Sequence, residues 1–348
     1  MNLRQHLLSG QVIPAHPLAL DAQRRFSERH QRALTRYQLA AGVGGLAVGV
    51  HSTQFEIREP RHGLYRPVLE LAAETARAEL QVAPRDVALI AGICGRTPQA
   101  VAEATLARSL GYHAGLVSMA AFRTEPEAEI IAHVATVACT LPVVGFYLQP
   151  SVGGRVFSHA FWRSFAEIPE VVAIKIAPFN RYQTLDVVRA VAASGRTDIA
   201  LYTGNDDTIV TDLLTPFVLE SDGRKVARRI VGGLLGHWGV WTHAAVRLFA
   251  AVQTAAGQPS LDPVWLTRAA AVTDMNAAIF DPVHRFAGCI PGILEVLRRQ
   301  GLVPTNLCLN PHEQLSPGQA EEITRVTLAY PELIDDAFVA EHRDRWLG

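Results

Sequence analysis

The stretch Val171-Val172-Ala173-Ile174-Lys175-Ile176 decides how this chain folds and where its chemistry lies. Four apolar residues, three of them branched, are typical of a buried strand, and the lysine stands near its C-terminal end. Burial removes the hydration that favours a charged amine, so it lowers the pKa of a lysine, and a neutral amine attacks a carbonyl to form a Schiff base. The alternative is a strand-end lysine whose tip reaches solvent.

The composition limits the classes of protein that fit. The 348 residues suffice for one large domain or two ordinary ones, and 49% apolar residues provide a sizeable core. A net charge of −1 creates no field that favours nucleic acid or an anionic membrane. The four cysteines form no CxxC pair, which indicates buried thiols in a reducing compartment. The polar start, MNLRQHLLSG, is not typical of a signal peptide, and no apolar run approaches about 18 residues, so we expect a soluble cytoplasmic protein.

Short apolar runs recur along the first two thirds of the chain. Their centres lie near residues 14, 48, 89, 116, 144, 173, 201 and 232. From the third run onward they come about 28 residues apart with helical patterns between them, and eight such βα units make a (β/α)8 TIM barrel. We predict this barrel over residues 1–242, with a doubly wound sheet as the competing architecture. Residues 243–348 carry only helical patterns, which predicts a C-terminal helical region packed on the barrel.

Tyr147 ends the fifth predicted strand, 28 residues before Lys175. Neighbouring strands lie about 4.8 Å apart, and catalytic groups gather at the C-terminal ends of barrel strands. We therefore expect the two side chains to meet over the barrel mouth, where a phenol can carry protons during imine formation and C–C cleavage. The alternative is a core tyrosine whose hydroxyl is satisfied by the backbone.

Two loops after predicted strands carry further candidates. The loop after the second strand contains His51, Ser52 and Thr53, and such residues suit the binding of a carboxylate through N–H and O–H donors, although they also favour an ordinary turn. The loop after the seventh strand begins Gly204-Asn205 and either contacts a substrate or caps a short helix. Thirteen histidines form no HxH or HExxH motif, so a metal-dependent hydrolase is the weaker hypothesis and we expect no metal.

These features together resemble the dihydrodipicolinate synthase / N-acetylneuraminate lyase family of class I aldolases and lyases, over about residues 12–330. The motifs that carry the resemblance are Val-Val-Ala-Ile-Lys ending at Lys175, Phe146-Tyr147-x-x-Pro150, Ala91-Gly92-Ile93-Cys94-Gly95-Arg96-Thr97, Ser109-Leu110-Gly111 and Thr203-Gly204-Asn205-Asp206-Asp207. The resemblance implies a (β/α)8 barrel with a C-terminal helical region and a homo-oligomer, either a dimer or a tetramer.

The resemblance also implies a reaction. Lys175 would form an imine with pyruvate or a related 2-oxo acid, Tyr147 would shuttle protons, and the loops after strands two and seven would hold the substrate. The product would come from aldol cleavage, condensation or dehydration of a 2-oxo (sugar) acid. No cofactor is needed, because the imine itself is the electron sink. The alternative of a different class is a non-catalytic binder of 2-oxo or sugar acids on the same barrel.

Two departures from the family pattern predict that the chain is not the synthase of the lysine pathway. Val152 stands where the resemblance places an arginine that binds the carboxylate of the second substrate, and Arg155 is close by but out of register. The segment from Ser118 to Phe122 lacks the tyrosine that completes a proton relay in many members. We therefore expect aspartate semialdehyde to be a poor acceptor and a longer sugar-derived or less polar aldehyde to react better.

Overall fold

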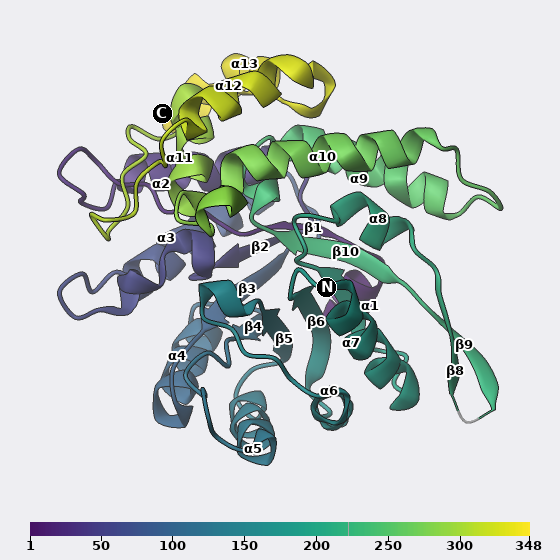
Figure 1. The fold of residues 1–348 in the computed structure, drawn as a ribbon. Helices are drawn as coiled ribbons and strands as arrows, with labels where there is room; N and C mark the ends of the chain where they lie inside the picture. Colours follow the sequence, from purple (N-terminus) through teal and green to yellow (C-terminus); the bar gives the residue numbers. More distant parts are fainter. Residues whose placement is uncertain (222) are drawn as a thin grey trace.

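Eight parallel strands form the central sheet of the protein in a computed structural model that describes residues 1–221 and 223–348 (Figure 1). They are β1 (Val12–Pro14), β2 (Gly45–Val48), β3 (Ala88–Ile93), β4 (Ala114–Val117), β5 (Val143–Leu148), β6 (Val171–Ala177), β7 (Ala200–Thr203) and β10 (Ile230–Leu235). The strand order is β1-β10-β7-β6-β5-β4-β3-β2, and a parallel bridge between Ala15 and Ala47 links the two edges. The sheet therefore nearly closes, which confirms the predicted TIM barrel.

Helices precede or follow the barrel strands along the chain. They are α1 (Leu3–Leu8), α2 (Glu28–Ala40), α3 (Tyr65–Val82), α4 (Thr97–Ser109), α5 (Glu127–Ala138), α6 (His159–Ala166), α7 (Arg181–Ala193) and α8 (Ile209–Leu214). The C-terminal helices are α9 (Thr242–Ala256), α10 (Val264–Phe280), α11 (Cys289–Arg299), α12 (Gln319–Ala329) and α13 (Asp336–Leu347). In Figure 1 they lie together across the top of the barrel.

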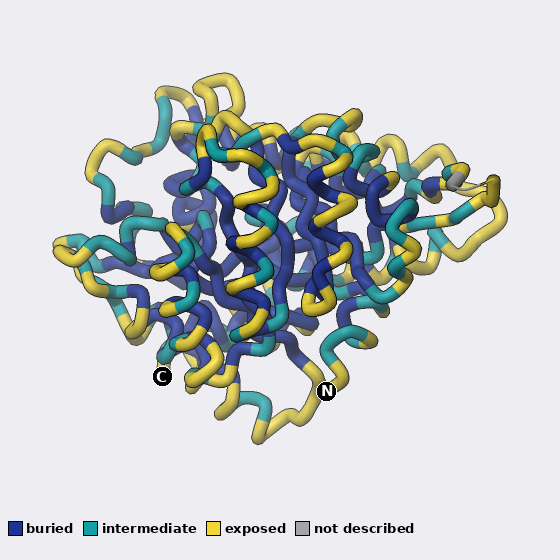
Figure 2. The backbone as a smooth tube through the Cα atoms, turned by 90° about the horizontal axis from the view of Figure 1, so that it is seen from below, coloured by how far each residue is buried: buried dark blue, intermediate teal, exposed yellow. Residues whose placement is uncertain are grey.

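Each barrel strand separates two apolar layers because its side chains alternate between the faces of the sheet. On β5, Val144, Phe146 and Leu148 belong to the cluster inside the barrel, whereas Val143 and Tyr147 belong to the cluster between the strands and the helices. Both layers are buried, as the dark centre of the tube in Figure 2 shows. A strand residue can therefore line the barrel mouth only from the inner face.

One register shift decides which residues meet at the barrel mouth. On β5 and β6, Val143 pairs with Val171, but the next residue, Val144, pairs with Ala173. The extra residue on β6 moves the partner of Lys175 from Tyr147 to Phe146. This shift cannot be read from the 28-residue spacing of the two strands.

Helix α1 covers the N-terminal end of the barrel, opposite the functional end. Tyr202 of β7 donates its hydroxyl proton to the carbonyl O of Leu7 at 2.8 Å, and Arg4 Nη1 donates to the carbonyl O of Val171 at 3.0 Å. The bottom of the barrel is therefore filled by packed side chains, and the interior is accessible from the C-terminal ends of the strands.

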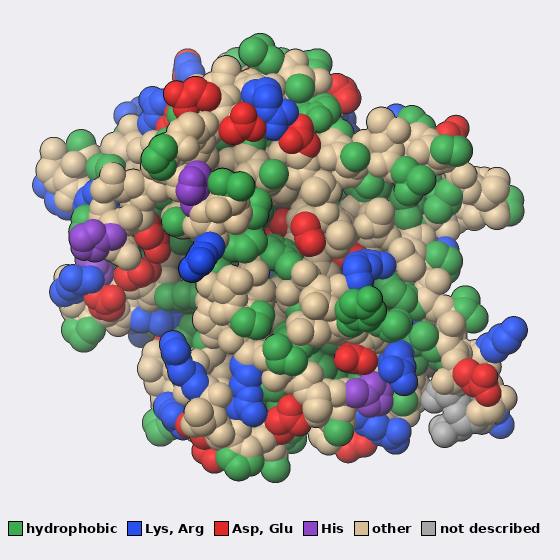
Figure 3. Space-filling model, in the orientation of Figure 1, with side chains coloured by type: hydrophobic (Ala, Val, Ile, Leu, Met, Phe, Trp, Pro, Cys, Tyr) green, Lys and Arg blue, Asp and Glu red, His purple; other side chains and the backbone are tan. Residues whose placement is uncertain are grey.

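A two-stranded hairpin, β8 (Phe217–Ser221) and β9 (Arg224–Arg228), separates α8 from β10 and was not predicted from the sequence. It projects to the right in Figure 1. On the face shown in Figure 3, basic and acidic side chains are interspersed. No helix in the described residues has the length and apolar character that crossing a membrane requires.

Candidate active site

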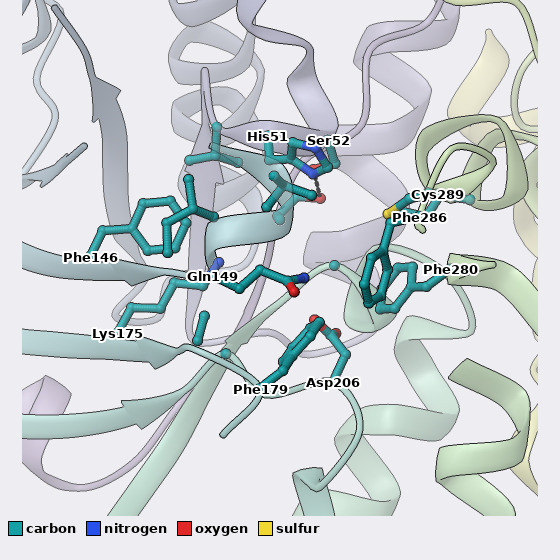
Figure 4. Close-up of a pocket in the computed structure, with 18 residues that line it drawn as sticks. His51, Ser52, Phe146, Gln149, Lys175, Phe179, Asp206, Phe280, Phe286 and Cys289 are labelled. Carbon is teal, nitrogen blue, oxygen red and sulfur yellow. Dashed lines mark hydrogen bonds between the residues drawn. The ribbon is translucent and has the colours of Figure 1, made fainter. Parts of the chain in front are cut away.

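A cavity opens at the C-terminal ends of the strands and encloses about 600 Å³ of empty space, part of it open to solvent. It extends from the barrel interior to the C-terminal helices (Figure 4). The residues that line it are Ala15, Val50, His51, Ser52, Phe146, Leu148, Gln149, Val152, Lys175, Ala177, Phe179, Gly204, Asp206, Gly236, Phe280, Phe286, Cys289 and Ile293.

Lys175 points from β6 into this cavity with only 7% of its side chain exposed. Burial lowers the pKa of its amine to about 8, although the nearby Asp206 carboxylate favours the protonated form. Its Nζ lies 4.5 Å from the centre of the Phe146 ring, the neighbour in register on β5. An amine with such a pKa is neutral in an appreciable fraction of molecules near neutral pH, as a nucleophile must be.

Gly204 makes room for the lysine side chain. A Cβ at this position would lie 2.5 Å from Cε of Lys175 and 3.0 Å from its Cγ, which is closer than real contacts allow. The prediction placed Gly204 at the substrate, and it does line the cavity. Its first effect, however, is to let Lys175 extend along the barrel wall.

Asp206 is the acidic group of the cavity and follows β7. Burial raises the pKa of its carboxyl to about 7, against the opposing effects of a hydrogen bond from the backbone N–H of His237 at 3.0 Å and of the Lys175 charge. Asn276 of α10 fixes this arrangement, because its Oδ1 accepts a hydrogen bond from Nδ1–H of His237 at 2.9 Å and its Nδ2 donates to the carbonyl O of Asp206. Asp206 and Lys175 form no ion pair within 4.0 Å among the described residues, so the two groups influence each other across the cavity without direct contact.

Of the three residues after β2 that were predicted to bind a carboxylate, two line the cavity. These residues form a short 3-10 helix, His51–Thr53, and His51 and Ser52 line the cavity whereas Thr53 does not. The hydroxyl of Thr53 donates to the carbonyl O of His16 at 2.7 Å and accepts from the backbone N–H groups of Gly49 and Val50, at 3.0 and 3.2 Å. Thr53 therefore holds the loop in shape and has no donor left for a carboxylate.

Donors for a carboxylate remain on the backbone of the same loop. Ser52 Oγ already donates to the carbonyl O of Ala15 at 2.9 Å. The backbone N–H groups of His51 and Ser52, in contrast, donate to no group within residues 1–221 and 223–348. Burial lowers the pKa of the His51 imidazole to about 4, and the Lys175 charge acts in the same direction, so this ring is neutral.

Arg58 fixes the start of this loop from below. Its Nη2 donates to the carbonyl oxygens of Gly49 and Gly92, at 3.0 and 2.9 Å, and its Nε pairs with the Glu103 carboxylate at 3.1 Å. Both partners of the ion pair are about nine-tenths buried. The charge of each is therefore compensated by the other, and the loop rests on a buried polar network.

Asn205 is buried and does not line the cavity. Its Nδ2 donates to Thr184 Oγ1 at 3.1 Å and to the Asp212 carboxylate at 2.9 Å, and its Oδ1 accepts from the backbone N–H of Phe179 at 2.9 Å. Both polar groups of the Asn205 side chain are therefore used by hydrogen bonds within the protein. Asn205 therefore ties the β6 and β7 loops together, and its neighbour Asp206, not Asn205, lines the cavity.

Tyr147 lies on the outer face of β5, and the structure does not bring it together with Lys175. Its ring packs against Phe157 and Trp162, with centroid distances of 6.0 and 5.0 Å, in the layer between the barrel and its helices. Its hydroxyl accepts a long hydrogen bond from the backbone N–H of Phe157 at 3.4 Å. This placement corrects the expected meeting of Tyr147 and Lys175 and matches the alternative of a core tyrosine. The register shift between β5 and β6 is the cause.

Sequence reasoning did not single out several residues of the cavity. Asp206 stood in a quoted motif, but no role was predicted for it. Gln149 follows β5 and points between Lys175 and Asp206 (Figure 4). The rings of Phe280 and Phe286 come from the C-terminal helical region, about a hundred residues after the lysine, and no local pattern links them to the barrel.

Val152 occupies the position where the family resemblance places a substrate-binding arginine. Val152 lines the cavity, whereas Arg155 is committed elsewhere. The Nη1 of Arg155 donates to the carbonyl oxygens of Glu125 and Phe122, at 2.7 and 3.5 Å. Among the described residues that line the cavity, Lys175 is thus the one basic side chain besides the neutral His51.

Comparison with known proteins places the chain in a family. The model of the dihydrodipicolinate synthetase family matches residues 8–216, so the chain belongs to this family. A search of the curated proteins finds no match.

Solved structures with the same fold include a dihydrodipicolinate synthase from Agrobacterium tumefaciens, with 18% identity, a TM-score of 0.73 and coverage of 94% of this chain and 99% of that one. An N-acetylneuraminate lyase from Fusobacterium nucleatum has 17% identity, a TM-score of 0.71 and coverage of 94% and 100%. A prophage protein of the same family from E. coli K12, in complex with pyruvate, has 17% identity, a TM-score of 0.70 and coverage of 94% and 99%. These similarities show a shared fold, and family membership supports a lyase or synthase.

Proposed function

We propose that this protein is a class I lyase or aldolase in which Lys175 forms a Schiff base with pyruvate or a related 2-oxo acid. The observation that carries the proposal is a buried lysine at the barrel mouth, with a pKa lowered to about 8, across a cavity from a buried carboxyl group. Perturbed ionisable groups that share a cleft are typical of catalytic sites. The pyruvate complex of the E. coli K12 relative supports the choice of ligand.

The two ionisable groups suit the first steps of the reaction. Burial lowers the pKa of Lys175 and raises that of Asp206, so near neutral pH the pair shares one proton in an equilibrium between two arrangements. With the proton on Asp206, the free amine of Lys175 attacks the C2 carbonyl to give a carbinolamine. Asp206 then donates its proton to the departing hydroxyl, water leaves, and the iminium forms.

The remaining steps use the iminium as the electron sink. In the condensation direction a proton leaves C3, the resulting enamine attacks the carbon of an aldehyde, and the new alkoxide takes up a proton. Water then hydrolyses the iminium and frees the lysine, and cleavage is the reverse sequence. Asp206 is the acid–base group that we propose for these transfers, in place of Tyr147, because it faces the cavity and the tyrosine does not. The backbone N–H groups of His51 and Ser52 hold the carboxylate.

Borohydride trapping tests the proposal directly because the chain has only two lysines, Lys175 and Lys225. Incubation with pyruvate and borohydride should add the reduced pyruvyl mass to the peptide that contains Lys175. The exposed Lys225, on β9, is an internal control in the same sample. Lys175→Met should abolish the adduct and Lys225→Met should not. Absence of an adduct with every 2-oxo acid tested, or an adduct confined to Lys225, refutes the proposal.

A non-catalytic binder of 2-oxo or sugar acids is the second candidate. The observation that favours it is the absence of a phenol among the described residues that line the cavity. A binder forms the same trapped adduct but releases no cleaved or dehydrated product. Turnover of a panel of 4-hydroxy-2-oxo acids, followed by pyruvate release, therefore separates the two.

We also propose that the protein is a homo-oligomer, a dimer or a tetramer, that works in the cytoplasm. Exposed apolar side chains on and near α10, such as Leu266 at 68% and Val283 at 84% exposure, are suited to a subunit contact. A monomeric dihydrodipicolinate synthase variant is also among the related structures, so light scattering of the purified protein is the test. The four cysteines are free thiols, as a reducing compartment maintains them.

A further inference from the structure

Three phenylalanine rings form the wall of the cavity that faces Lys175 (Figure 4). Phe179 comes from the loop after β6, Phe280 from the last turn of α10, and Phe286 from the segment that leads into α11. The rings of Phe179 and Phe286 lie 5.7 Å apart, centre to centre, and are tilted by 42°. The three side chains thus form one aromatic surface on the side of the cavity away from the barrel strands.

The backbone holds two of these rings in conformations that aromatic residues rarely adopt. Phe179 has φ of 51° and Phe286 has φ of 66°, in the left-handed region. Asn205 Oδ1 accepts the N–H of Phe179, and the carbonyl O of Asp281 accepts the N–H of Phe286, both at 2.9 Å. Strain of this kind persists where surrounding contacts enforce it and is concentrated at functional sites. The hydrogen bonds of the Phe179 and Phe286 backbones therefore fix the positions of these two rings in the cavity.

A second hollow lies on the other side of this wall. It encloses about 520 Å³ of empty space, part of it open to solvent. Phe179, Asp206, Phe280 and Phe286 line both spaces, so the rings stand between the lysine and the second hollow. The aromatic side chains therefore border open space on both of their sides.

The surroundings of the aromatic wall disfavour a negatively charged group on the part of the ligand that lies there. Val152 offers no donor, Arg155 is turned away, and the acidic Asp206 lies beside the rings. Gln149 is an uncharged polar residue of the cavity, and its carboxamide makes no hydrogen bond within the part of the chain that the structure describes. One hydroxyl or carbonyl oxygen near the reacting carbon therefore finds a partner, whereas a second carboxylate finds none.

We infer that the second substrate is an aldehyde with an uncharged aryl group, whose ring lies on the wall formed by Phe179, Phe280 and Phe286. This inference rests on the proposed function and names its acceptor. The enamine carbon of Lys175-bound pyruvate forms a bond to the aldehyde carbon, and the aldehyde oxygen takes up the proton that C3 released. Hydrolysis of the iminium consumes the water that its formation set free. The product of benzaldehyde and pyruvate is 4-hydroxy-2-oxo-4-phenylbutanoate, and no oxidant or reductant is required.

The experiment compares aldehydes at saturating pyruvate with the full-length protein. Benzaldehyde, 4-carboxybenzaldehyde, glyceraldehyde and aspartate semialdehyde are the acceptors, and mass spectrometry measures the condensation product. We expect kcat/KM for benzaldehyde to exceed the values for glyceraldehyde and aspartate semialdehyde by about 10- to 100-fold, the effect of burying one phenyl ring. Adding a carboxylate to the same ring, in 4-carboxybenzaldehyde, should lower kcat/KM by about tenfold or more.

Variants of the wall identify the surface responsible. Phe286→Ala should lower kcat/KM for benzaldehyde by about 10- to 100-fold and change that for glyceraldehyde by less than about threefold. Phe286→Leu keeps most of the volume and should have an intermediate effect, which guards against misfolding of the alanine variant. The matched control is Phe338→Ala, because Phe338 of α13 is also half-buried but packs on His243 and Trp346, outside the cavity. It should leave every rate unchanged.

The outcomes distinguish this inference from the proposed function. Equal or faster reaction of glyceraldehyde or aspartate semialdehyde overturns the aryl acceptor, and so does an equal loss for all acceptors in Phe286→Ala. In both cases a pyruvate adduct on Lys175 leaves the proposed function standing. If pyruvate is not trapped at Lys175 at all, the proposed function fails and the acceptor inference fails with it.

Discussion

Replacing Asp206 by asparagine should lower the pKa of Lys175 and at the same time slow turnover. Asparagine keeps the shape and the oxygen that accepts the N–H of His237, and it removes only the charge. Because the negative charge stabilises the protonated amine, its loss favours the neutral form. Wild-type Lys175, with a pKa of about 8, is neutral in about 10% of molecules at pH 7, against about 0.03% for an unperturbed lysine.

The size of the shift follows from the separation of the two charges. Two unit charges 4 Å apart interact by about 4 kcal/mol at an effective dielectric constant of about 20, which sets an upper limit of about 3 pKa units. Lys175 and Asp206 are farther apart than that, so we expect a decrease of about 1 to 2 units and a midpoint near pH 6 to 7. The amine becomes more available, yet kcat should fall by about 10²- to 10⁴-fold, because the acid–base group is gone.

Lysine labelled with ¹³C at Cε provides the assay, since two lysines give two resonances and Lys225 serves as the reference. The Lys175 resonance is followed from pH 5 to 10, and turnover is measured on the same samples. Asp207→Asn is the matched control, because it removes the neighbouring exposed carboxylate, which does not line the cavity. An unchanged or raised Lys175 midpoint in Asp206→Asn would contradict the electrostatic coupling, and unchanged kcat would refute the acid–base role.

Three further variants test the geometry around the lysine. Tyr147→Phe should leave kcat within about threefold of wild type, because the hydroxyl accepts one long hydrogen bond outside the cavity. Loss of a proton-carrying phenol would instead lower kcat by about 10²- to 10⁴-fold, and steady-state kinetics decides between the two. Gly204→Ala should lower the rate of pyruvate trapping by at least about tenfold, because its Cβ collides with the Lys175 side chain, and wild-type trapping would show that the lysine has another route. Arg58→Met should lower the free energy of unfolding by about 3 to 5 kcal/mol, since it leaves the Glu103 carboxylate buried and unpaired, and urea unfolding of the Arg58→Met/Glu103→Gln double variant should recover part of that loss.

The repeat of apolar runs predicted the barrel because a buried strand and an amphipathic helix each impose their own period on the chain. All eight predicted strand centres fall within strands of the barrel. The predicted placement of Tyr147 was wrong because face orientation depends on single residues, and one extra residue on β6 reverses which side chain of β5 meets Lys175. A spacing of 28 residues does not contain that information.

Some of the predicted site residues lie at the cavity and others do not. Lys175, Gly204, His51 and Ser52 lie at the cavity, as expected for residues at strand ends. Thr53 and Asn205 have the hydrogen-bonding groups that a substrate needs, but their own backbone and neighbours already use them. The sequence shows which groups can bind, and only the folded chain shows which of them remain unsatisfied. The hairpin β8–β9 carried no apolar alternation strong enough to predict it.

Two of the three rings of the aromatic wall, Phe280 and Phe286, come from a different part of the chain than the lysine, and this separation affects how the protein evolves. The strands that carry the reactive amine are constrained by barrel closure, where a change of one residue alters the register of the neighbouring strand. Phe280 and Phe286, in contrast, lie where α10 runs into α11, a segment that contributes nothing to the sheet. A duplicated copy of the gene can therefore acquire a new acceptor by exchanging the stretch between residues 280 and 289 while the carbonyl chemistry is inherited intact. Grafting that stretch between homologues is, for the same reason, the shortest path to an aldolase with altered selectivity.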